Sequence, residues 1–355
     1  MIDSAYRLHI LPGALDAVGA VARVAARAHR YAIVTDSNVG PLYAERVESS
    51  LAGTGTQVFV IPAGETHKTR ETWASVTDQM LDAGFGRDSA VIALGGGVVG
   101  DLAGFVAATY MRGIPFIQVP TTLLAMLDAS IGGKTGVDTR SGKNLVGAFH
   151  PASAVIIDPA VLATLPRRQF RAGLGEALKH GVIADRMHFD AVATLAAEHR
   201  DRLPDLRAVS AIVARSVEIK SAVVASDARE AGRRKTLNFG HTLGHAIEHL
   251  SGYSLLHGEA VAIGMCLESA LAERAGIAER GTTDRIRAAC EGAGLPTQRP
   301  DDLAPAAILD AAAGDKKGRE GRAEYALPLG IGRMAFSERG WAAPMDDALV
   351  LAALS

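Results

Sequence analysis

The sequence predicts an α/β N-terminal domain with a largely parallel sheet, followed by an all-helical C-terminal domain. Short β-branched segments alternate with helical patterns through the first half, which is typical of βαβ units. After about Pro166, segments rich in Ala, Leu, Glu and Arg carry a helical periodicity nearly to the C-terminus, without convincing strand patterns. We therefore place the domain boundary near Leu165–Arg168, between residues 1–166 and residues 167–355.

Five segments of the first half are predicted strands, namely Tyr31–Thr35, Gln57–Ile61, Ala90–Leu94, Phe116–Val119 and Ala154–Ile157. Helical patterns lie between them, for example over Thr69–Ala83 and Val98–Thr109. Ligands of parallel sheets bind beyond the carboxyl ends of the strands. We therefore expect the residues that follow the strands to line a binding site, which are Asp36, Gly64-Glu65, Gly95–Gly97 and Thr121-Thr122.

Composition and charge disfavour several classes of protein. The chain has 355 residues, 48% of them hydrophobic, and a formal net charge of −2. No basic run stands out, which argues against a nucleic-acid partner or an anionic membrane surface. The N-terminus lacks the apolar run of a signal peptide, and Cys266 and Cys290 have no metal-like spacing. We therefore expect a soluble cytoplasmic protein without a disulfide framework.

A glycine-rich turn follows the third predicted strand. Gly95, Gly97 and Gly100 satisfy the pattern G-x-G-x-x-G between a strand and a helix, where backbone N–H groups can approach a pyrophosphate. The acidic residue expected some twenty positions later is absent. The motif is therefore compatible with dinucleotide binding and also with a tight structural turn. Asp36, at the end of the first strong strand, is an alternative partner for a ribose hydroxyl.

Cationic and polar residues gather between positions 112 and 144, namely Arg112, Asp128, Lys134, Lys143 and Asn144. The pieces YMRGIP, GGKTG and SGKN are predicted loops, where side chains can converge on an anionic ligand. GGKTG lacks the spacing of a P-loop, so ATP hydrolysis is disfavoured. A single lysine would be an ordinary surface charge, but three cations in a region otherwise poor in charge favour an anion site.

Four of the eleven histidines lie between Leu237 and Met265, at His241, His245, His249 and His257. The first three are four residues apart, so they would share one face of a helix. Buried imidazoles need carboxylates, a metal ion or a substrate as partners. Thr242 stands where the Glu of H-E-x-x-H peptidases would be, which disfavours peptidase chemistry. Spacing alone favours His241 and His245 as a metal-binding pair.

Taken together, these motifs resemble the 3-dehydroquinate synthases, which belong to the sugar-phosphate cyclases. The resemblance spans nearly the whole chain through Thr35–Val39, Pro62–Lys68, Gly95–Asp138, Gly142–Phe149, Arg171–Gly181, Leu237–His249, His257–Met265 and Asp315–Gly321. It implies a nucleotide-binding sheet that holds NAD, followed by a helical domain that holds the metal and the substrate. It also places the metal, usually zinc and alternatively cobalt or another divalent ion, on Glu176, His241 and His257. Three protein ligands with an open position suit a catalytic zinc.

The resemblance implies the remaining contacts as well. The matched NAD contacts are Asp36, Glu65, Lys68, Gly96, Gly97, Asp101, Thr121, Thr122, Lys143, Thr164 and Leu165. The matched substrate contacts are Arg112, Asp128, Lys134, Asn144, Lys179, Lys220, Arg234, Asn238, His245 and one lysine of the Asp315-Lys316-Lys317 segment, for which we take Lys316. His249 keeps a structural interpretation.

The family's substrate is 3-deoxy-D-arabino-heptulosonate 7-phosphate, and its product in the shikimate pathway is 3-dehydroquinate. The resemblance implies transient oxidation at C5 by NAD, loss of phosphate, re-reduction, ring opening and aldol closure. The enzyme would then be an NAD- and zinc-dependent carbon–oxygen lyase, working as a homodimer on a phosphorylated sugar acid. The substrate's own phosphate would serve as the base, positioned by Lys134, Asn144 and His245. The cationic contacts explain how a substrate with a carboxylate and a phosphate is held.

Three alternatives remain at this point. Another sugar-phosphate cyclase of secondary metabolism would differ in the substrate pocket, and the presence of Arg234, Asn238 and the Asp315-Lys316-Lys317 segment favours dehydroquinate formation. A metal-dependent polyol dehydrogenase would not need phosphate-binding cations and would release NADH. A regulatory protein that binds NAD or a metal without catalysis would not need the intact substrate motifs.

Overall fold

The computed structural model describes residues 7–140, 142–200, 202, 204–227, 230–315 and 323–355. The chain divides into two compact units, one ending at Leu165 and the other beginning at Pro166. Among the helices that the structure describes, none is both long enough and apolar enough to cross a bilayer.

The first unit is built on a parallel sheet, as the sequence predicts. In its described part, six strands follow the order β1-β8-β5-β4-β2-β3, and every neighbouring pair is parallel. The strands are β1 (Arg7–Ile10), β2 (Arg30–Asp36), β3 (Gly55–Ile61), β4 (Ser89–Gly95), β5 (Phe116–Pro120) and β8 (Ala154–Ile157). The structure confirms the five predicted strands. Strand β1 escaped prediction because it is a short edge strand whose RLHI sequence is only partly buried.

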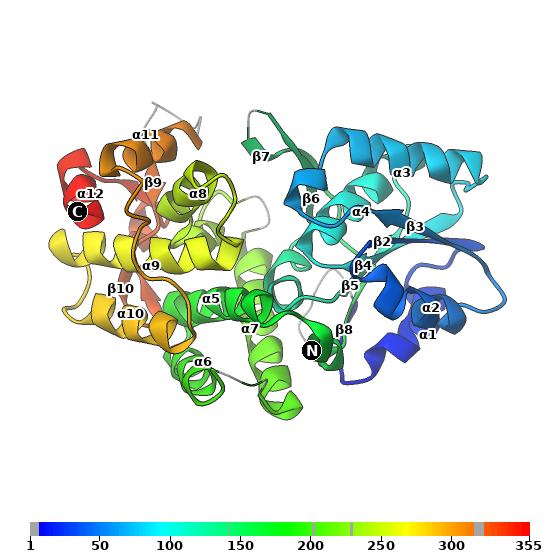
Figure 1. Cartoon of the computed structure of the whole chain (residues 1–355), viewed down its shortest axis with the longest axis horizontal. Coiled ribbons are helices and arrows are strands. Elements are labelled where there is room, and N and C mark those ends of the chain that lie inside the picture. Colours follow the sequence, from blue (N-terminus) through cyan, green and yellow to red (C-terminus); the bar gives the residue numbers. More distant parts are fainter. Residues whose placement is uncertain (1–6, 141, 201, 203, 228–229, 316–322) are drawn as a thin grey trace. The chain divides into compact units, whose positions relative to one another are not determined.

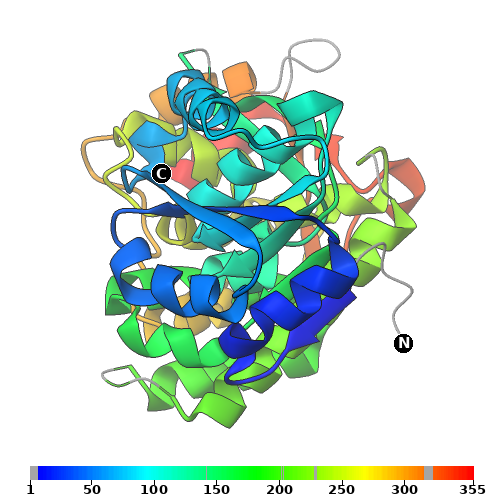
Figure 2. The ribbon, with the colours of Figure 1, turned by 90° about the vertical axis from the view of Figure 1, so that its right-hand side faces the viewer.

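Helices cover both faces of this sheet (Figure 1, Figure 2). Helices α1 (Val18–Ala25) and α2 (Gly40–Ser50) lie on one face, and α3 (Arg70–Asp82) and α4 (Gly97–Thr109) lie on the other. Thr69 caps α3, because its side chain accepts a hydrogen bond from Thr72 N at 3.2 Å. Because all the strands run in parallel, the segments after β2, β3, β4, β5 and β8 begin at one edge of the sheet.

The predicted loops GGKTG and SGKN are wrong in part, because they enter an antiparallel hairpin. Strand β6 (Lys134–Thr139) pairs with β7 (Gly142–Phe149). The glycines of this hairpin allow close strand pairing, since a Cβ on Gly147 would lie only 2.1 Å from the carbonyl oxygen of Thr135. Residues Thr135–Val137 are buried, and β6 contacts α4. Lys134, Gly136, Gly142 and Lys143, which suggested loops, therefore belong to a strand pair.

The second unit is mainly helical, which confirms the predicted class for this half. Its helices are α5 (Arg167–Ala184), α6 (Arg186–Glu198), α7 (Leu206–Ser226), α8 (His241–Leu250), α9 (His257–Arg274), α10 (Thr282–Gly292), α11 (Pro305–Asp315) and α12 (Asp347–Leu354). The expectation of helices alone needs correction, because β9 (Glu324–Tyr325), β10 (Pro328–Gly330), β11 (Arg333–Met334) and β12 (Ala343–Pro344) form two small antiparallel pairs. Strands of two or three residues are too short to show an alternating pattern.

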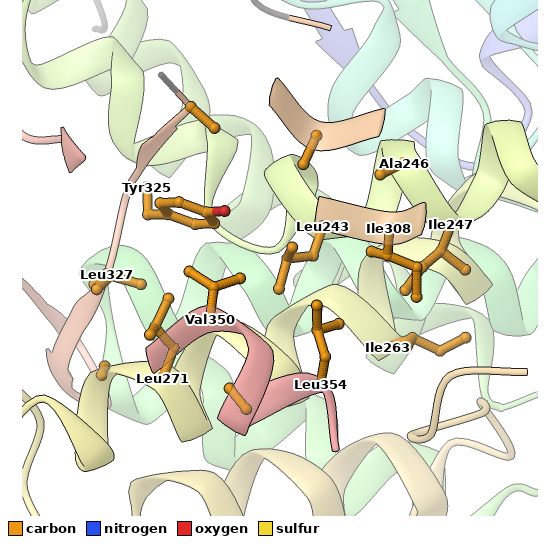
Figure 3. Close-up of a cluster of buried hydrophobic side chains, with 14 residues drawn as sticks. Leu243, Ala246, Ile247, Ile263, Leu271, Ile308, Tyr325, Leu327, Val350 and Leu354 are labelled. Atoms are coloured by element: carbon orange, nitrogen blue, oxygen red, sulfur yellow. The ribbon is translucent and has the colours of Figure 1, made fainter. Parts of the chain in front are cut away.

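Helices α8 and α9 pack at the centre of a hydrophobic cluster (Figure 3). Leu243 and Ile247 of α8 and Ile263 of α9 are essentially inaccessible to solvent. Burying side chains of this size contributes about 1.5–3 kcal/mol each. The helices approach closely, because a Cβ on Gly244 would lie 2.9 Å from the carbonyl oxygen of Ala260. This packing fixes the first residues of the two helices, which are His241 and His257.

Candidate functional site

A carboxylate and two imidazoles meet in the second unit. Glu176 lies in the middle of α5, whereas His241 and His257 begin α8 and α9. The Nε2 atoms of His241 and His257 lie 3.3 and 3.4 Å from the same oxygen, Oε1 of Glu176. The structure therefore brings together three residues that the sequence separates by up to 81 positions (257 − 176).

Both imidazoles turn Nε2 toward this carboxylate because Nδ1 is held elsewhere. Nδ1 of His241 lies 3.1 Å from the carbonyl oxygen of Phe239, so we assign the proton to Nδ1, which donates to that oxygen. Nδ1 of His257 lies 3.2 Å from Oε2 of Glu248 and is assigned in the same way. Metal-binding histidines show this arrangement, with one nitrogen anchored by a carbonyl or carboxylate and the other directed at the metal.

The charges at this site suit a cation. Glu176 is fully buried and neither of its oxygens makes a hydrogen bond of good geometry, although Lys179 Nζ forms an ion pair with Oε2. Burial by itself raises the pKa of Glu176, but the charges of Lys179 and His241 outweigh it and hold the pKa well below its ordinary value. Glu176 is therefore an anion, with one oxygen facing two imidazole nitrogens.

The two imidazoles differ in their electrostatics. Burial and the charge of Lys179 lower the pKa of His241 to about 3. Burial also disfavours the charged form of His257, but the carboxylates of Glu176 and Glu248 outweigh it and raise the pKa to about 10. The carboxylates on either side of His257 thus favour its charged form, whereas burial favours the neutral form of His241. A buried carboxylate with two imidazole nitrogens is a donor set that fits Zn²⁺ or Co²⁺.

His245 lies beside these residues, one helical turn after His241. Its ring centroid is 5.0 Å from that of His241 and 5.5 Å from that of His257. The three imidazoles offer nitrogen atoms within 4.8 Å of one another, so they form a second possible ligand set. The pair predicted from spacing, His241 and His245, and the set implied by the resemblance both remain within reach of one ion. Both sets contain His241, and His249 instead contacts Tyr253, with ring centroids 6.0 Å apart.

Buried cations accompany the metal-type donors in the second unit. Lys179, Lys220 and Arg234 expose 1%, 7% and 2% of their surface. Asp227 fixes the turn before Arg234, because its Oδ2 accepts the backbone N–H groups of Gly232 at 2.7 Å and Arg234 at 3.0 Å. Buried lysine and arginine are rare outside ion pairs and anion sites.

Two further predicted substrate contacts of this unit are Asn238, which follows Arg234 in the chain, and Lys316. Asn238 ends η6 (Arg233–Asn238), and its Nδ2 donates to Oε1 of Glu230 at 2.8 Å. Lys316, with the neighbouring Lys317, lies outside the described residues.

In the first unit, the glycine-rich turn forms a cradle at the start of α4. A Cβ on Gly96 would lie 3.0 Å from the side chain of Thr122, and one on Gly97 would lie 3.4 Å from Ala129. Thr121 donates its N–H to the carbonyl oxygen of Gly95 at 2.9 Å, while its buried hydroxyl has no hydrogen-bond partner. A buried hydroxyl without a partner beside the open N–H groups of a helix start fits an anionic ligand.

The turn also has a structural function, because a Cβ on Gly95 would lie 2.5 Å from Val99. The two interpretations of the motif, a tight turn and an anion cradle, therefore apply together. Asp36 closes the turn after β2, since its Oδ1 accepts the N–H groups of Asn38 and Val39 at 2.8 and 2.9 Å. Thr164, followed by Leu165, bonds through Oγ1 to the hydroxyl of Tyr43 at 2.7 Å.

Lys68 is the centre of a buried ion cluster at the same edge. Its Nζ lies 2.9 Å from Glu65 Oε1, 3.4 Å from Asp101 Oδ2 and 3.5 Å from Asp138 Oδ1. Lys143 Nζ also contacts Glu65, at 3.3 Å. Burial disfavours the charge of Lys68, but the surrounding carboxylates outweigh it and raise the pKa above its ordinary value. The structure thus joins four of the predicted NAD contacts.

Sequence reasoning missed Asp138 in this cluster. Its N–H donates to the carbonyl oxygen of Lys68 at 2.7 Å, and its Oδ1 accepts the N–H of Asn144 at 2.9 Å. Asn144 adopts the left-handed conformation, with φ of 54°. An acidic residue four positions after Lys134, in a segment rich in cations, was the available signal.

The remaining predicted substrate contacts of the first unit lie on irregular backbone or on β6. Arg112 has φ of 69° and follows Met111, with φ of 50°. Asp128 lies in a π-type turn, η4 (Ala125–Ala129), and Lys134 is exposed at the start of β6. Left-handed backbone outside glycine is costly and concentrates at functional sites.

Comparison with known proteins identifies relatives over nearly the whole chain. Residues 58–172 match the family model "3-dehydroquinate synthase N-terminal", and residues 173–318 match "3-dehydroquinate synthase C-terminal". A 3-dehydroquinate synthase from Caldanaerobacter subterraneus is 47% identical over 337 residues, which are 94% of this chain and 93% of that protein.

Solved structures of cyclases have the same fold. The 2-epi-5-epi-valiolone synthase from Streptomyces hygroscopicus, with NAD⁺ and Zn²⁺ bound, is 34% identical, with a TM-score of 0.88 over 100% of this chain and 97% of that one. A 2-deoxy-scyllo-inosose synthase, in complex with carbaglucose-6-phosphate, NAD⁺ and Co²⁺, is 26% identical, with a TM-score of 0.89 over 99% and 97%.

Proposed function

We propose that this chain, which belongs to the 3-dehydroquinate synthase family, converts 3-deoxy-D-arabino-heptulosonate 7-phosphate into 3-dehydroquinate and phosphate. The observation that carries the proposal is the convergence of Glu176, His241 and His257 beside the buried Lys179. It supplies the donors for a divalent ion and the charge for an anionic substrate in one place. The enzyme is an NAD-dependent carbon–oxygen lyase that acts on a phosphate.

Glu176, His241 and His257 would hold the metal, for which we propose zinc, with cobalt as a substitute. A divalent ion bound there stabilises negative charge that develops on a substrate oxygen. Around it, Lys179 keeps Glu176 ionised, and the Phe239 carbonyl and Glu248 hold the imidazoles in the binding orientation. His245 lies next to both imidazole ligands, which suits the predicted substrate contact.

NAD would bind at the carboxyl edge of the sheet in the first unit. Bound NAD supplies reversible acceptance of a hydride. The N–H groups at the start of α4 and the buried hydroxyl of Thr121 would bind its phosphates, and Asp36, which ends the neighbouring strand β2, would bind a ribose hydroxyl. The cluster around Lys68 would hold the loop that carries Glu65 in place beside the nucleotide.

The substrate's carboxylate and phosphate would pair with cationic side chains, for which we propose Arg112, Lys134, Lys179, Lys220 and Arg234. Three of them, Lys179, Lys220 and Arg234, are buried, and buried cations bind such groups strongly because little water competes with them. Lys134, Asn144 and His245 would orient the phosphate, which itself takes up the proton in the elimination. A polyol dehydrogenase has no need for this number of phosphate-binding cations, so the cyclase is favoured over it.

One assay tests the function. Purified protein receives the heptulosonate phosphate with NAD⁺ and Zn²⁺, while free phosphate and the absorbance of NADH are followed together and the organic product is identified by mass spectrometry. Phosphate and 3-dehydroquinate in equal amounts, without net NADH, support the proposal. Accumulating NADH would identify a dehydrogenase, and a different carbocycle would identify another cyclase. Absence of turnover in a metal- and NAD-loaded protein would contradict catalysis on this substrate.

We also propose that the protein works in the cytoplasm as a homodimer. The support for the location is that Cys266 and Cys290 are both free thiols, which suits a reducing compartment. The dimer rests on the family resemblance. Light scattering of the purified protein should give twice the mass of the 37.0 kDa chain, and a monomer at micromolar concentration would contradict it.

A further inference from the structure

Glu248 is a buried carboxylate to which the sequence assigned no function. It lies in the last turn of α8 and exposes only 4% of its surface. Its Oε2 is 3.2 Å from Nδ1 of His257, at the start of the next helix. Helix α8 therefore supplies one candidate metal ligand, His241, from its first residue and contacts a second, His257, from its last turn.

The side chain of Glu248 is not needed to end the helix. The backbone carbonyl of Glu248 already accepts hydrogen bonds from Tyr253 N at 3.1 Å and from Ser251 Oγ at 2.8 Å. These bonds involve the main chain of Glu248 and remain when the side chain changes. Burying a carboxylate costs several kcal/mol unless a charged or hydrogen-bonding partner compensates it, and His257 is a partner of the required kind.

The two imidazoles beside Glu176 are held by different acceptors. A neutral carbonyl oxygen, that of Phe239, accepts from Nδ1 of His241, whereas an ionisable carboxylate accepts from Nδ1 of His257. A carboxylate fixes the ring orientation and also makes the opposite nitrogen a stronger donor to a metal. His241 and His257 therefore contact the same oxygen of Glu176, but Nε2 of His257 should be the stronger metal donor of the two.

We infer that Glu248 is a positioning residue of the metal site, which fixes Nε2 of His257 toward the metal and strengthens that nitrogen as a ligand. The inference rests on the proposed function only in taking His257 as a metal ligand. It concerns metal affinity, so it is tested without substrate and without NAD.

A matched control is available at the start of α9. Glu259 is another buried carboxylate, 9% exposed, two residues after His257. Its oxygens accept from Arg168 at 2.7 Å and from Leu256 N at 2.8 Å. Glu259→Gln keeps an acceptor for Leu256 and removes the same charge as Glu248→Gln, but Glu259 contacts an arginine where Glu248 contacts an imidazole.

The experiment measures Co²⁺ affinity of the metal-free full chain by competition with a chromophoric chelator. Glu248→Ala is expected to weaken Co²⁺ binding about 10–100-fold, the usual effect of removing such a partner from a metal-binding histidine. Glu248→Gln should weaken Co²⁺ binding less than Glu248→Ala does, because its amide oxygen still accepts from Nδ1 of His257 but carries no charge. Glu259→Gln should bind Co²⁺ as the wild type does. The visible absorption bands of bound Co²⁺ should change in Glu248→Ala and stay unchanged in Glu259→Gln.

Three outcomes would overturn the inference: wild-type Co²⁺ affinity in Glu248→Ala, an equal loss in Glu259→Gln, or a wild-type chain that binds no Co²⁺. Urea unfolding of each metal-free variant separates a loss of fold from a loss of affinity, and Glu248→Gln provides the comparison if the alanine variant does not fold. A wild type that binds Co²⁺ tightly but releases no phosphate from the heptulosonate would contradict the proposed function alone, and the assignment of Glu248 would stand.

Discussion

Gly264 and Gly240 meet so closely that a Cβ on Gly264 would lie 1.9 Å from the carbonyl oxygen of Gly240. The contact joins α9 to the residue that precedes α8, and Gly240 itself adopts a φ of 77°, which favours glycine. The position of His241, the next residue, therefore depends on the absence of a side chain at residue 264.

Gly264→Ala is expected to destabilise the second unit and to weaken metal binding. The backbone would have to shift, and overpacking of this kind costs about 1–3 kcal/mol or more. Urea unfolding and Co²⁺ titration of the metal-free variant measure the two effects. Gly314→Ala is the control, because a Cβ there meets nothing within 4 Å; it should stabilise α11 by about 0.5–1 kcal/mol. Unchanged stability of Gly264→Ala would contradict the close packing.

Glu176→Ala is expected to lose the bound zinc. The substitution removes the carboxylate that both imidazole Nε2 atoms approach, and it leaves the charge of Lys179 to repel a cation. Metal content after dialysis, measured by atomic emission, should fall to background and phosphate release should stop. Glu198→Ala, on the exposed end of α6, should keep its zinc. A fully loaded and active Glu176→Ala would remove Glu176 from the site.

Lys68→Met is expected to destabilise the first unit strongly. It would leave Glu65, Asp101 and Asp138 without their buried cation, and breaking a buried pair typically costs about 3–5 kcal/mol. NAD affinity, measured by calorimetry, should fall as well. Arg46→Met provides a comparison, because the ion pair of Arg46 with Asp16 is largely exposed and should contribute no more than about 1 kcal/mol. Equal losses of unfolding free energy in Lys68→Met and Arg46→Met would show that the buried cluster stabilises the fold no more than an exposed ion pair does.

Asp101 predicts a pH dependence of stability. Burial, opposed in part by Lys68, raises the pKa of Asp101 from 3.8 to about 6 in the folded chain. Between these values the folded state binds more protons than the unfolded state, so this group's contribution favours folding at low pH and is lost as the pH rises through about 6. Asp101→Asn should flatten the dependence of the unfolding free energy on pH between about 4 and 6.

Urea unfolding at a series of pH values measures this dependence for the wild type and for Asp101→Asn. Asp78→Asn, an exposed carboxylate on α3, controls for the loss of one negative charge. If Asp101→Asn keeps the wild-type slope, another group is responsible for it.

The first unit shows what periodicity can and cannot predict. The strands β2, β4 and β5 are apolar and buried along their length, so their β-branched segments were recognisable. The predicted loops GGKTG and SGKN overlap the first residues of β6 and β7, because close pairing at glycines such as Gly136 gives these strands the composition of turns. Pairing partners and the space beside a glycine are tertiary properties, which composition does not contain.

The metal-type site shows the same limit in the second unit. Helical spacing connected His241 with His245, because both lie on α8. The approach of Glu176 and His257 depends on how α9 packs against α5 and α8, which the spacing does not encode. The family resemblance supplied those two residues as expectations, and the geometry brings them together with His241. Neither source indicated that Glu248 contacts His257.

Asp138, in the hairpin of β6 and β7, joins this hairpin to the loop that follows β3. Asp138 bonds by its N–H to the backbone of Lys68, by its side chain to Lys68 Nζ and to the N–H of Asn144. Lys68 is a predicted nucleotide contact and Asn144 a predicted substrate contact. We therefore expect NAD bound at Lys68 to restrict the movement of Asn144, and the substrate bound at Asn144 to restrict the movement of Lys68. Thermodynamic linkage makes such an effect reciprocal. If bound NAD changes the affinity for the sugar acid by some factor, the bound sugar acid changes the affinity for NAD by the same factor.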